Sequence, residues 1–135
     1  VLVLTGATGF LGRELVHHLL REEPDTRLAL LIRGRDEAEA RARGLAVLGD
    51  RLTGEALAAA QRRVEIVRAD LERDQLGLDA ASHAALVGRT VGVIHGAASV
   101  SFALPLAQAR AINVEGTRKM LDLARAAGCP LDYVG

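Results

Sequence analysis

The feature that most constrains this chain is its first segment, where a short apolar run leads directly into a glycine-rich turn and a helical pattern. Residues 5–12 read TGATGFLG, which spaces three glycines as Gly-x-x-Gly-x-x-Gly. We expect Gly6 to allow a sharp turn off a strand, Gly9 to let backbone N–H groups approach a pyrophosphate, and Gly12 to pack the helix on the sheet. The positive end of the helix then faces the phosphates, so this segment predicts a dinucleotide site.

Apolar runs and helical patterns alternate along the rest of the chain. After the first apolar run, the patterns predict strands at about 28–32, 64–67, 91–95 and 131–134, and helices at about 10–21, 37–48, 55–61, 80–87 and 105–127. Strands that alternate with helices predict an α/β fold with a doubly wound parallel sheet. Crossover rules favour a Rossmann-like order of 3-2-1-4-5.

The spacing of apolar residues also predicts which helix faces are buried. In the first helix we expect Leu11, Leu15 and Leu19 to face the sheet, with Val16 and Leu20 beside them. In the last helix we expect a buried face at these positions: Ile112, Gly116, Met120, Leu123 and Ala127.

Composition excludes several classes of function. The 135 residues are enough for one domain, and 17 basic residues balance 17 acidic ones, so no charge excess favours nucleic acid or an anionic membrane as a partner. No apolar run has membrane-spanning length. A single cysteine, Cys129, allows no disulfide within the chain, and the histidines show no metal spacing, so we expect no metal and a cytoplasmic location.

Arg33 follows the second predicted strand, about 20 residues beyond the glycine motif, where dinucleotide-binding domains read the ribose. A guanidinium there suits a 2′-phosphate, whereas a carboxylate suits a free hydroxyl, so we favour NADP over NAD. The alternative is a solvated arginine. Asp36 and Glu37 lie nearby and fit the first turn of the next helix.

Other candidates end the third and fourth strands. Asp70 would accept a hydrogen bond from the adenine amino group, with Leu71 over the ring; its alternative role is to cap the turn that follows. Gly96, Ala97 and Ala98 are small enough to let the backbone lie against the nicotinamide half. The histidine before them, His95, fits a structural role better than a catalytic one.

Together these motifs resemble the extended short-chain dehydrogenase/reductase family over nearly the whole chain. Residues 31–35 (LIRGR), followed by an Ala- and Arg-rich helical insert, resemble its thioester reductase and fatty acyl-CoA reductase branch. The resemblance implies roles for matching residues. Thr8, Gly9, Phe10 and Leu11 would hold the pyrophosphate, Arg33 and Arg43 the 2′-phosphate, Asp70 and Leu71 the adenine, and Gly96, Ala97 and Ala98 the nicotinamide ribose.

The same resemblance implies an activity. The expected reaction is hydride transfer from NADPH to an acyl thioester, carried by a carrier protein or coenzyme A, to give an aldehyde or alcohol. The family's catalytic Tyr-x-x-x-Lys pair is missing, because the lone Tyr133 follows the lone Lys119. We therefore expect residues 1–135 to be the NAD(P)-binding N-terminal part of a longer reductase domain in a multidomain enzyme, with no catalytic residue and no activity alone.

Two other functions fit the same motifs. One is an NAD-dependent sugar-nucleotide epimerase or dehydratase, although such enzymes usually have an acidic residue at the position of Arg33 and a shorter connection after it. The other is a dinucleotide-binding module that has no catalytic activity. In every case the predicted last strand would leave a bare sheet edge.

Overall fold

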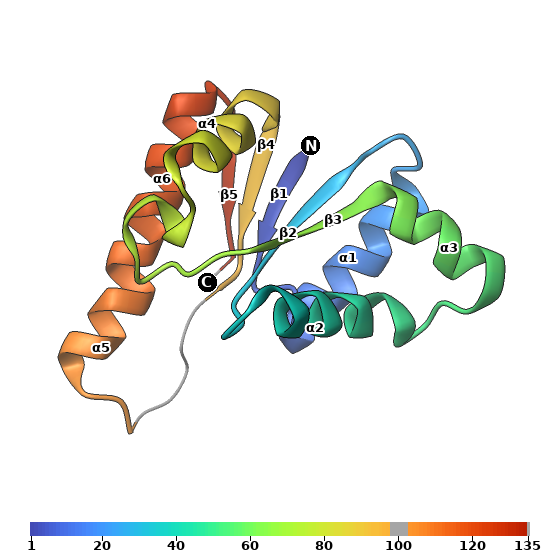
Figure 1. The fold of residues 1–135 in the computed structure, drawn as a ribbon, viewed down its shortest axis with the longest axis horizontal. Coiled ribbons are helices and arrows are strands. Elements are labelled where there is room, and N and C mark those ends of the chain that lie inside the picture. Colours follow the sequence, from blue (N-terminus) through green and yellow to red (C-terminus); the bar gives the residue numbers. More distant parts are fainter. Residues whose placement is uncertain (98–102, 135) are drawn as a thin grey trace.

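The computed structural model describes residues 1–97 and 103–134, which form a central parallel sheet with helices on both faces (Figure 1). The strands of this part are β1 (Leu2–Thr5), β2 (Leu28–Ile32), β3 (Val64–Arg68), β4 (Gly92–His95) and β5 (Leu131–Tyr133). They lie in the order β3-β2-β1-β4-β5, and each neighbouring pair is parallel. The predicted fold class and strand order are confirmed.

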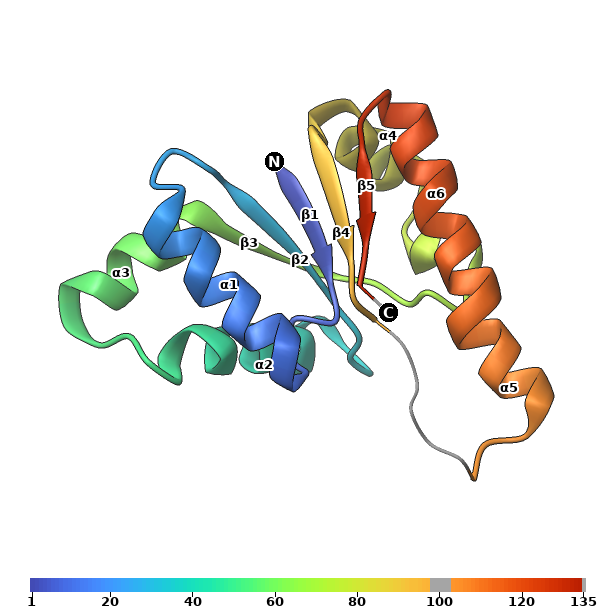
Figure 2. The same ribbon diagram turned by 180° about the vertical axis from the view of Figure 1, so that it is seen from behind.

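Two helical layers enclose the sheet, as the two opposite views show (Figures 1 and 2). One layer holds α1 (Phe10–Glu22), α2 (Glu37–Gly49) and α3 (Gly54–Arg63), whose apolar residues share a core with Leu4, Leu28 and Leu30. The other holds α4 (Ala80–Arg89), α5 (Leu106–Arg110) and α6 (Gly116–Ala127), and its core includes Val3 and Leu31. Alternate residues of the strands therefore point into opposite cores.

Local sequence explains where the elements begin and end. All five residues of β2 are buried, as expected for an apolar run in the middle of a parallel sheet. Asp36 caps α2 by accepting a hydrogen bond from the Glu39 N–H at 2.8 Å, which confirms its predicted place at the helix N-terminus. Gly128 ends α6 in the left-handed conformation, with φ at 65°.

The predicted orientation of α1 is wrong at its first turn. Leu11 is 55% exposed, whereas Val16 and His17 are the buried residues of the helix. The rotation of α1 is set by Gly12, which lies against the glycine turn so closely that a Cβ would come within 1.9 Å of the Gly6 carbonyl oxygen. The apolar stripe that follows from Gly12 passes through Leu15, Val16 and Leu19, and Leu11 lies beside it.

Two further elements have no counterpart in the prediction. A 3₁₀ turn, η1 (Asp74–Gly77), follows β3 and buries Leu76 in a left-handed conformation with φ at 60°. A π-helical turn, η2 (Ala111–Glu115), joins α5 to α6 where the sequence predicted one regular helix. Single π turns inside α-helices often lie at functional sites, and this one borders the groove described below.

In the parts of the chain that the structure describes, no helix combines the length and the apolar character needed to span a membrane.

Candidate functional site

A groove of about 750 Å³ lies at the carboxyl ends of β1, β2, β3 and β4. This is the side of a doubly wound sheet on which ligands bind. Its floor is the turn after β1, and its far wall is the helical segment that contains α5 and η2. The lining residues are Thr5, Gly6, Ala7, Thr8, Gly9, Leu31, Ile32, Arg33, Arg43, Ala69, Asp70, Leu71, Glu72, Gly96, Ala97, Leu104, Gln108 and Ile112.

Two glycines of the motif are required by the packing of the protein itself. Gly6 has φ at 80°, and a Cβ there would lie 2.6 Å from the Gly96 carbonyl oxygen. A Cβ on Gly12 would overlap the Gly6 carbonyl oxygen, at 1.9 Å. These contacts confirm the predicted sharp turn at Gly6 and the predicted close helix packing at Gly12.

Gly9 differs, because nothing in the described structure requires a glycine there. Its φ of −78° suits any residue, and a Cβ would meet only the Gly6 carbonyl oxygen, at an ordinary contact distance of 3.4 Å. It is the N-cap of α1, a position where Ser, Thr, Asp and Asn are the usual choices. The first N–H groups of a helix have no partner within the helix, so a Cβ at Gly9 would narrow the approach to these donors.

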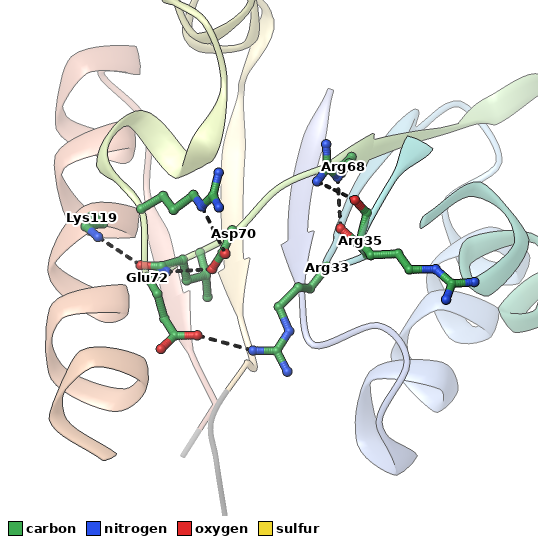
Figure 3. Close-up of polar contacts among 9 residues, drawn as sticks. Arg33, Arg35, Arg68, Asp70, Glu72 and Lys119 are labelled. Atoms are coloured by element: carbon green, nitrogen blue, oxygen red, sulfur yellow. Dashed lines mark hydrogen bonds and ion pairs between the residues drawn. The ribbon is translucent and has the colours of Figure 1, made fainter. Parts of the chain in front are cut away.

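Polar side chains line the groove where β2 and β3 end (Figure 3). The Arg33 guanidinium, on the β2 side, pairs with the Glu72 carboxylate at 3.2 Å across the opening, and its side chain is 66% exposed. Asp70 accepts a hydrogen bond from the Glu72 N–H at 3.0 Å, so it caps the turn after β3. Its other carboxylate oxygen lies 3.7 Å from Arg73 Nε. Asp70 therefore has the turn-capping role that the sequence analysis gave as an alternative, and its side chain also lines the groove.

A hydrogen-bonded chain centred on His95 connects β1, β4 and η2. The Thr117 hydroxyl donates to the Asn113 carbonyl oxygen at 2.7 Å, so it accepts from His95 Nε2 at 3.0 Å. His95 Nδ1 is then the acceptor for the Thr5 hydroxyl at 2.7 Å, and the Thr5 oxygen accepts from the Ala97 N–H at 3.2 Å.

For a neutral imidazole, this chain of donors and acceptors places the proton of His95 on Nε2. His95 is fully buried, and burial lowers its pKa below the ordinary value. The His95 ring contacts the Thr5 hydroxyl, and Thr5 in turn accepts hydrogen bonds from the Gly96 and Ala97 N–H groups, so these contacts indicate a structural role for His95.

The lone tyrosine and the lone lysine of the chain, Tyr133 and Lys119, do not form a catalytic pair. Lys119 Nζ donates to the Leu71 carbonyl oxygen at 3.0 Å and so fixes the turn after β3 (Figure 3). Tyr133 is 57% exposed on the edge strand β5, with its ring 5.8 Å from the His95 ring. Among residues 1–97 and 103–134, no group of three or more His, Cys, Asp or Glu residues is placed to hold a metal ion.

Comparisons with known proteins agree with this geometry. Residues 4–134 match the model of the NAD-binding family described as "Male sterility protein". The chain belongs to this family.

Solved structures place it close to one group of reductases. The terminal R domain from the myxalamid PKS-NRPS biosynthetic pathway is 38% identical, with a TM-score of 0.85, and the match covers 99% of this chain and 34% of that one. The reductase domain of a nonribosomal peptide synthetase from Mycobacterium tuberculosis is 33% identical, with a TM-score of 0.77, over 99% of this chain and 32% of that one.

A curated relative, the isonitrile lipopeptide synthase of Streptomyces coeruleorubidus, is 36% identical over 98% of this chain and 9% of its own length. The chain thus spans about a third of the solved R domains and a small part of this synthase. The resemblance to the thioester reductase branch of the extended short-chain reductases is confirmed.

The fold brings together most of the residues that the sequence analysis predicted to bind the cofactor. Nine of them line the groove: Gly6, Thr8, Gly9, Arg33, Arg43, Asp70, Leu71, Gly96 and Ala97. Phe10, Leu11 and Gly12 do not line it, and Phe10 is 86% exposed at the start of α1. Ala98 lies outside the described residues.

Several groove residues of this family member were not among those predicted. Glu72 directly follows Asp70 and Leu71 at the end of β3, so its position after a strand was a usable signal. Leu104 and Gln108 reach the groove from the segment before and within α5, and no strand end or motif marks them. Their place depends on how that segment lies over the sheet, which the apolar pattern does not define.

Proposed function

We propose that this chain is the NADPH-binding part of a reductase that transfers hydride to an acyl thioester. The observation that carries the proposal is a dinucleotide-type groove whose β2 end has an arginine, in a chain 38% identical to a terminal R domain. A reductase of the short-chain family needs this groove whatever its substrate. The similarity to R domains is what supports an acyl thioester as the substrate.

The residues present fit a nicotinamide dinucleotide. Because Gly9 has no Cβ, there is open space directly at the N-terminus of α1. N–H groups at that helix end suit a pyrophosphate. Asp70 and Leu71 line the same groove after β3, which supports their proposed contact with the adenine. When bound, the reduced dinucleotide supplies the hydride.

The preference for NADP is supported by the charge at the end of β2. Arg33 offers a fork of donors that matches a phosphate dianion, and Arg43 lines the same part of the groove. The Arg33–Glu72 pair is exposed, so exchanging Glu72 for a phosphate costs little. Asp36 does not compete, because its carboxylate caps α2.

For the substrate, we propose an acyl group on a carrier-protein phosphopantetheine or on coenzyme A, presented by neighbouring domains. Hydride addition to the thioester carbonyl and protonation of its oxygen give a hemithioacetal, which collapses to an aldehyde and a free thiol. A second reduction gives an alcohol. The chain contains no Tyr-x-x-x-Lys sequence, so we propose that residues outside it transfer the proton. We also propose that residues 1–135 alone are inactive. A cytoplasmic location fits the single free Cys129.

The test is a paired titration of the full-length protein with NADPH and NADH, followed by nicotinamide fluorescence or calorimetry. We expect tighter binding of NADPH, with the preference lost in Arg33→Ala. Oxidation of NADPH on addition of an acyl-CoA or an acylated carrier protein, with the aldehyde trapped, then tests the reaction. Preference for NADH would contradict the cofactor assignment and favour a sugar-nucleotide enzyme. NADPH binding without turnover of any thioester would favour a non-catalytic module.

A further inference from the structure

The loop that follows β2 is held by two arginines, Arg43 and Arg68, whose guanidinium groups donate hydrogen bonds to its backbone carbonyl oxygens. Arg68 Nε donates to the Gly34 carbonyl oxygen at 2.9 Å, and Arg68 Nη2 donates to the Arg35 carbonyl oxygen at 2.8 Å. Arg43 donates to the carbonyl oxygen of Arg33. Three consecutive carbonyl oxygens, of residues 33–35, therefore each accept a hydrogen bond from a guanidinium.

Arg68 is placed for this contact by the sheet itself. It is the last residue of β3 and lies opposite Ile32, the last residue of β2. The Ala69 N–H extends that pairing by donating to the Ile32 carbonyl oxygen at 3.0 Å. The half-buried Arg68 side chain then crosses to the neighbouring loop (Figure 3).

Other contacts fix the loop from its opposite side. The Arg35 N–H donates to the Glu39 carboxylate at 2.8 Å. Gly34 packs on the first turn of α2, where a Cβ would lie 2.7 Å from the Ala40 nitrogen. With its carbonyls and one N–H all engaged, the loop has a defined backbone, and the Arg33 side chain extends from it toward Glu72.

The charge pattern on this side also depends on Arg68. A second hollow of about 610 Å³ adjoins the groove and is lined by arginines 33, 35, 43, 68 and 73, together with carboxylates. Carbonyl oxygens carry partial negative charge and would repel a phosphate placed beside Arg33. The Arg68 guanidinium binds two of these oxygens, which leaves the phosphate a more positive surface.

We propose that Arg68 is a positioning residue that makes the site select a 2′-phosphorylated dinucleotide, by fixing the 33–35 loop from which Arg33 projects. The inference rests on the proposed dinucleotide function and extends it to a residue that need not touch the cofactor. Because NADH lacks the 2′-phosphate, its binding depends much less on this loop.

The experiment compares dissociation constants of NADPH and NADH for the full-length protein and for Arg68→Met, which keeps an unbranched side chain of similar length without donors. We expect NADPH binding to weaken about tenfold, the size expected when charged hydrogen bonds are removed, while NADH binding changes by less than about twofold. Arg68→Lys, which can reach one carbonyl, should restore part of the preference.

Arg63 provides a matched control. Its guanidinium also clamps backbone carbonyls, of Leu20 at 2.8 Å and Thr26 at 3.2 Å, but it does so at the end of the sheet away from the groove. Arg63→Met should lower the thermal midpoint by an amount similar to Arg68→Met and leave the NADPH-to-NADH preference unchanged.

Each result decides the inference. An unchanged preference in Arg68→Met, or an equal loss of both affinities, would overturn it while the proposed function stands. If the parent protein binds neither dinucleotide, the proposed function fails, and this inference with it. Should Arg68→Met not fold, the same preference measured in Arg68→Lys carries the decision, because one lost carbonyl contact still predicts a weaker preference for NADPH.

Discussion

The two sides of the groove are built by different physical means. The glycine turn after β1 is fixed by packing, since a Cβ at Gly6 or Gly12 would collide with backbone atoms. The loop after β2 has one close packing contact, at Gly34, but its carbonyl oxygens are held by hydrogen bonds from guanidinium groups that are partly exposed to solvent. A closely packed backbone contact has no room for an added side-chain atom. Exposed polar contacts contribute less to the free energy of unfolding than such packing does, and salt screens them. Substitutions at Gly6 or Gly12 should therefore affect folding most, and those among the polar residues after β2 should chiefly affect the choice of ligand.

The largest effect should come from Gly12→Ala. The new methyl group would have to occupy space 1.9 Å from the Gly6 carbonyl oxygen, so α1 must move away from the sheet. We expect a loss of more than about 3 kcal/mol in the free energy of unfolding, measured by chemical denaturation. Gly49→Ala in α2 is the control, because a Cβ there meets nothing within 4 Å. Equal stability of the two variants would show that packing does not fix the turn.

Gly9→Ser should separate folding from binding within the same motif. Serine is at least as good an N-cap as glycine, so the free energy of unfolding should change by less than about 0.5 kcal/mol. The added side chain should nevertheless weaken NADPH binding about tenfold or more, measured by calorimetry. An unchanged affinity in a folded Gly9→Ser protein would mean that no ligand approaches the N-terminus of α1 closely.

This contrast also explains what the sequence could predict. Gly6 and Gly12 could be assigned because only glycine satisfies a sharp turn and a close helix contact, whatever surrounds them. Strand ends in a parallel sheet meet at one edge, so the strand pattern alone was enough to place Arg33, Asp70 and Gly96 together. Gly9 and the arginines are different, because their roles depend on a ligand or on neighbouring backbone.

The parts that escaped prediction depend on tertiary contacts. The rotation of α1 follows from the contact of Gly12 with Gly6, and the spacing of leucines alone placed Leu11 toward the sheet. A long arginine side chain can reach in several directions, so nothing in the sequence shows that Arg68 binds carbonyl oxygens. The spacing of apolar residues does not distinguish the π turn from an α-helix, since Ile112 and Gly116 fit a regular helix equally well.

A pH dependence should appear on the packed side through His95. Burial lowers its pKa, so between the unfolded-state value, about 6.5, and the lower folded value the unfolded chain binds more protons. The stability contributed by neutral His95 is complete above about pH 6.5 and is lost as the pH falls toward the folded pKa. The slope from this residue is at most about 1.4 kcal/mol per pH unit.

The check is denaturation of the parent protein and of His95→Gln at several pH values. Glutamine can keep polar contacts with Thr5 or Thr117 but does not titrate, so the difference in unfolding free energy between the two proteins should shrink as the pH falls below about 6.5. A constant difference across this range would mean that His95 does not bind an extra proton on unfolding.

The smallest effect should come from Glu72→Gln on the polar side. The Arg33–Glu72 pair is solvent-exposed, so its loss should change the free energy of unfolding by only about 0–1 kcal/mol, and less at high salt. The same change releases Arg33 from its partner, so NADPH binding should become about twofold to fivefold tighter, with NADH unchanged. Weaker NADPH binding in Glu72→Gln would show instead that the ion pair holds Arg33 in the orientation that the phosphate requires, which would make the polar side as dependent on fixed geometry as the glycine turn.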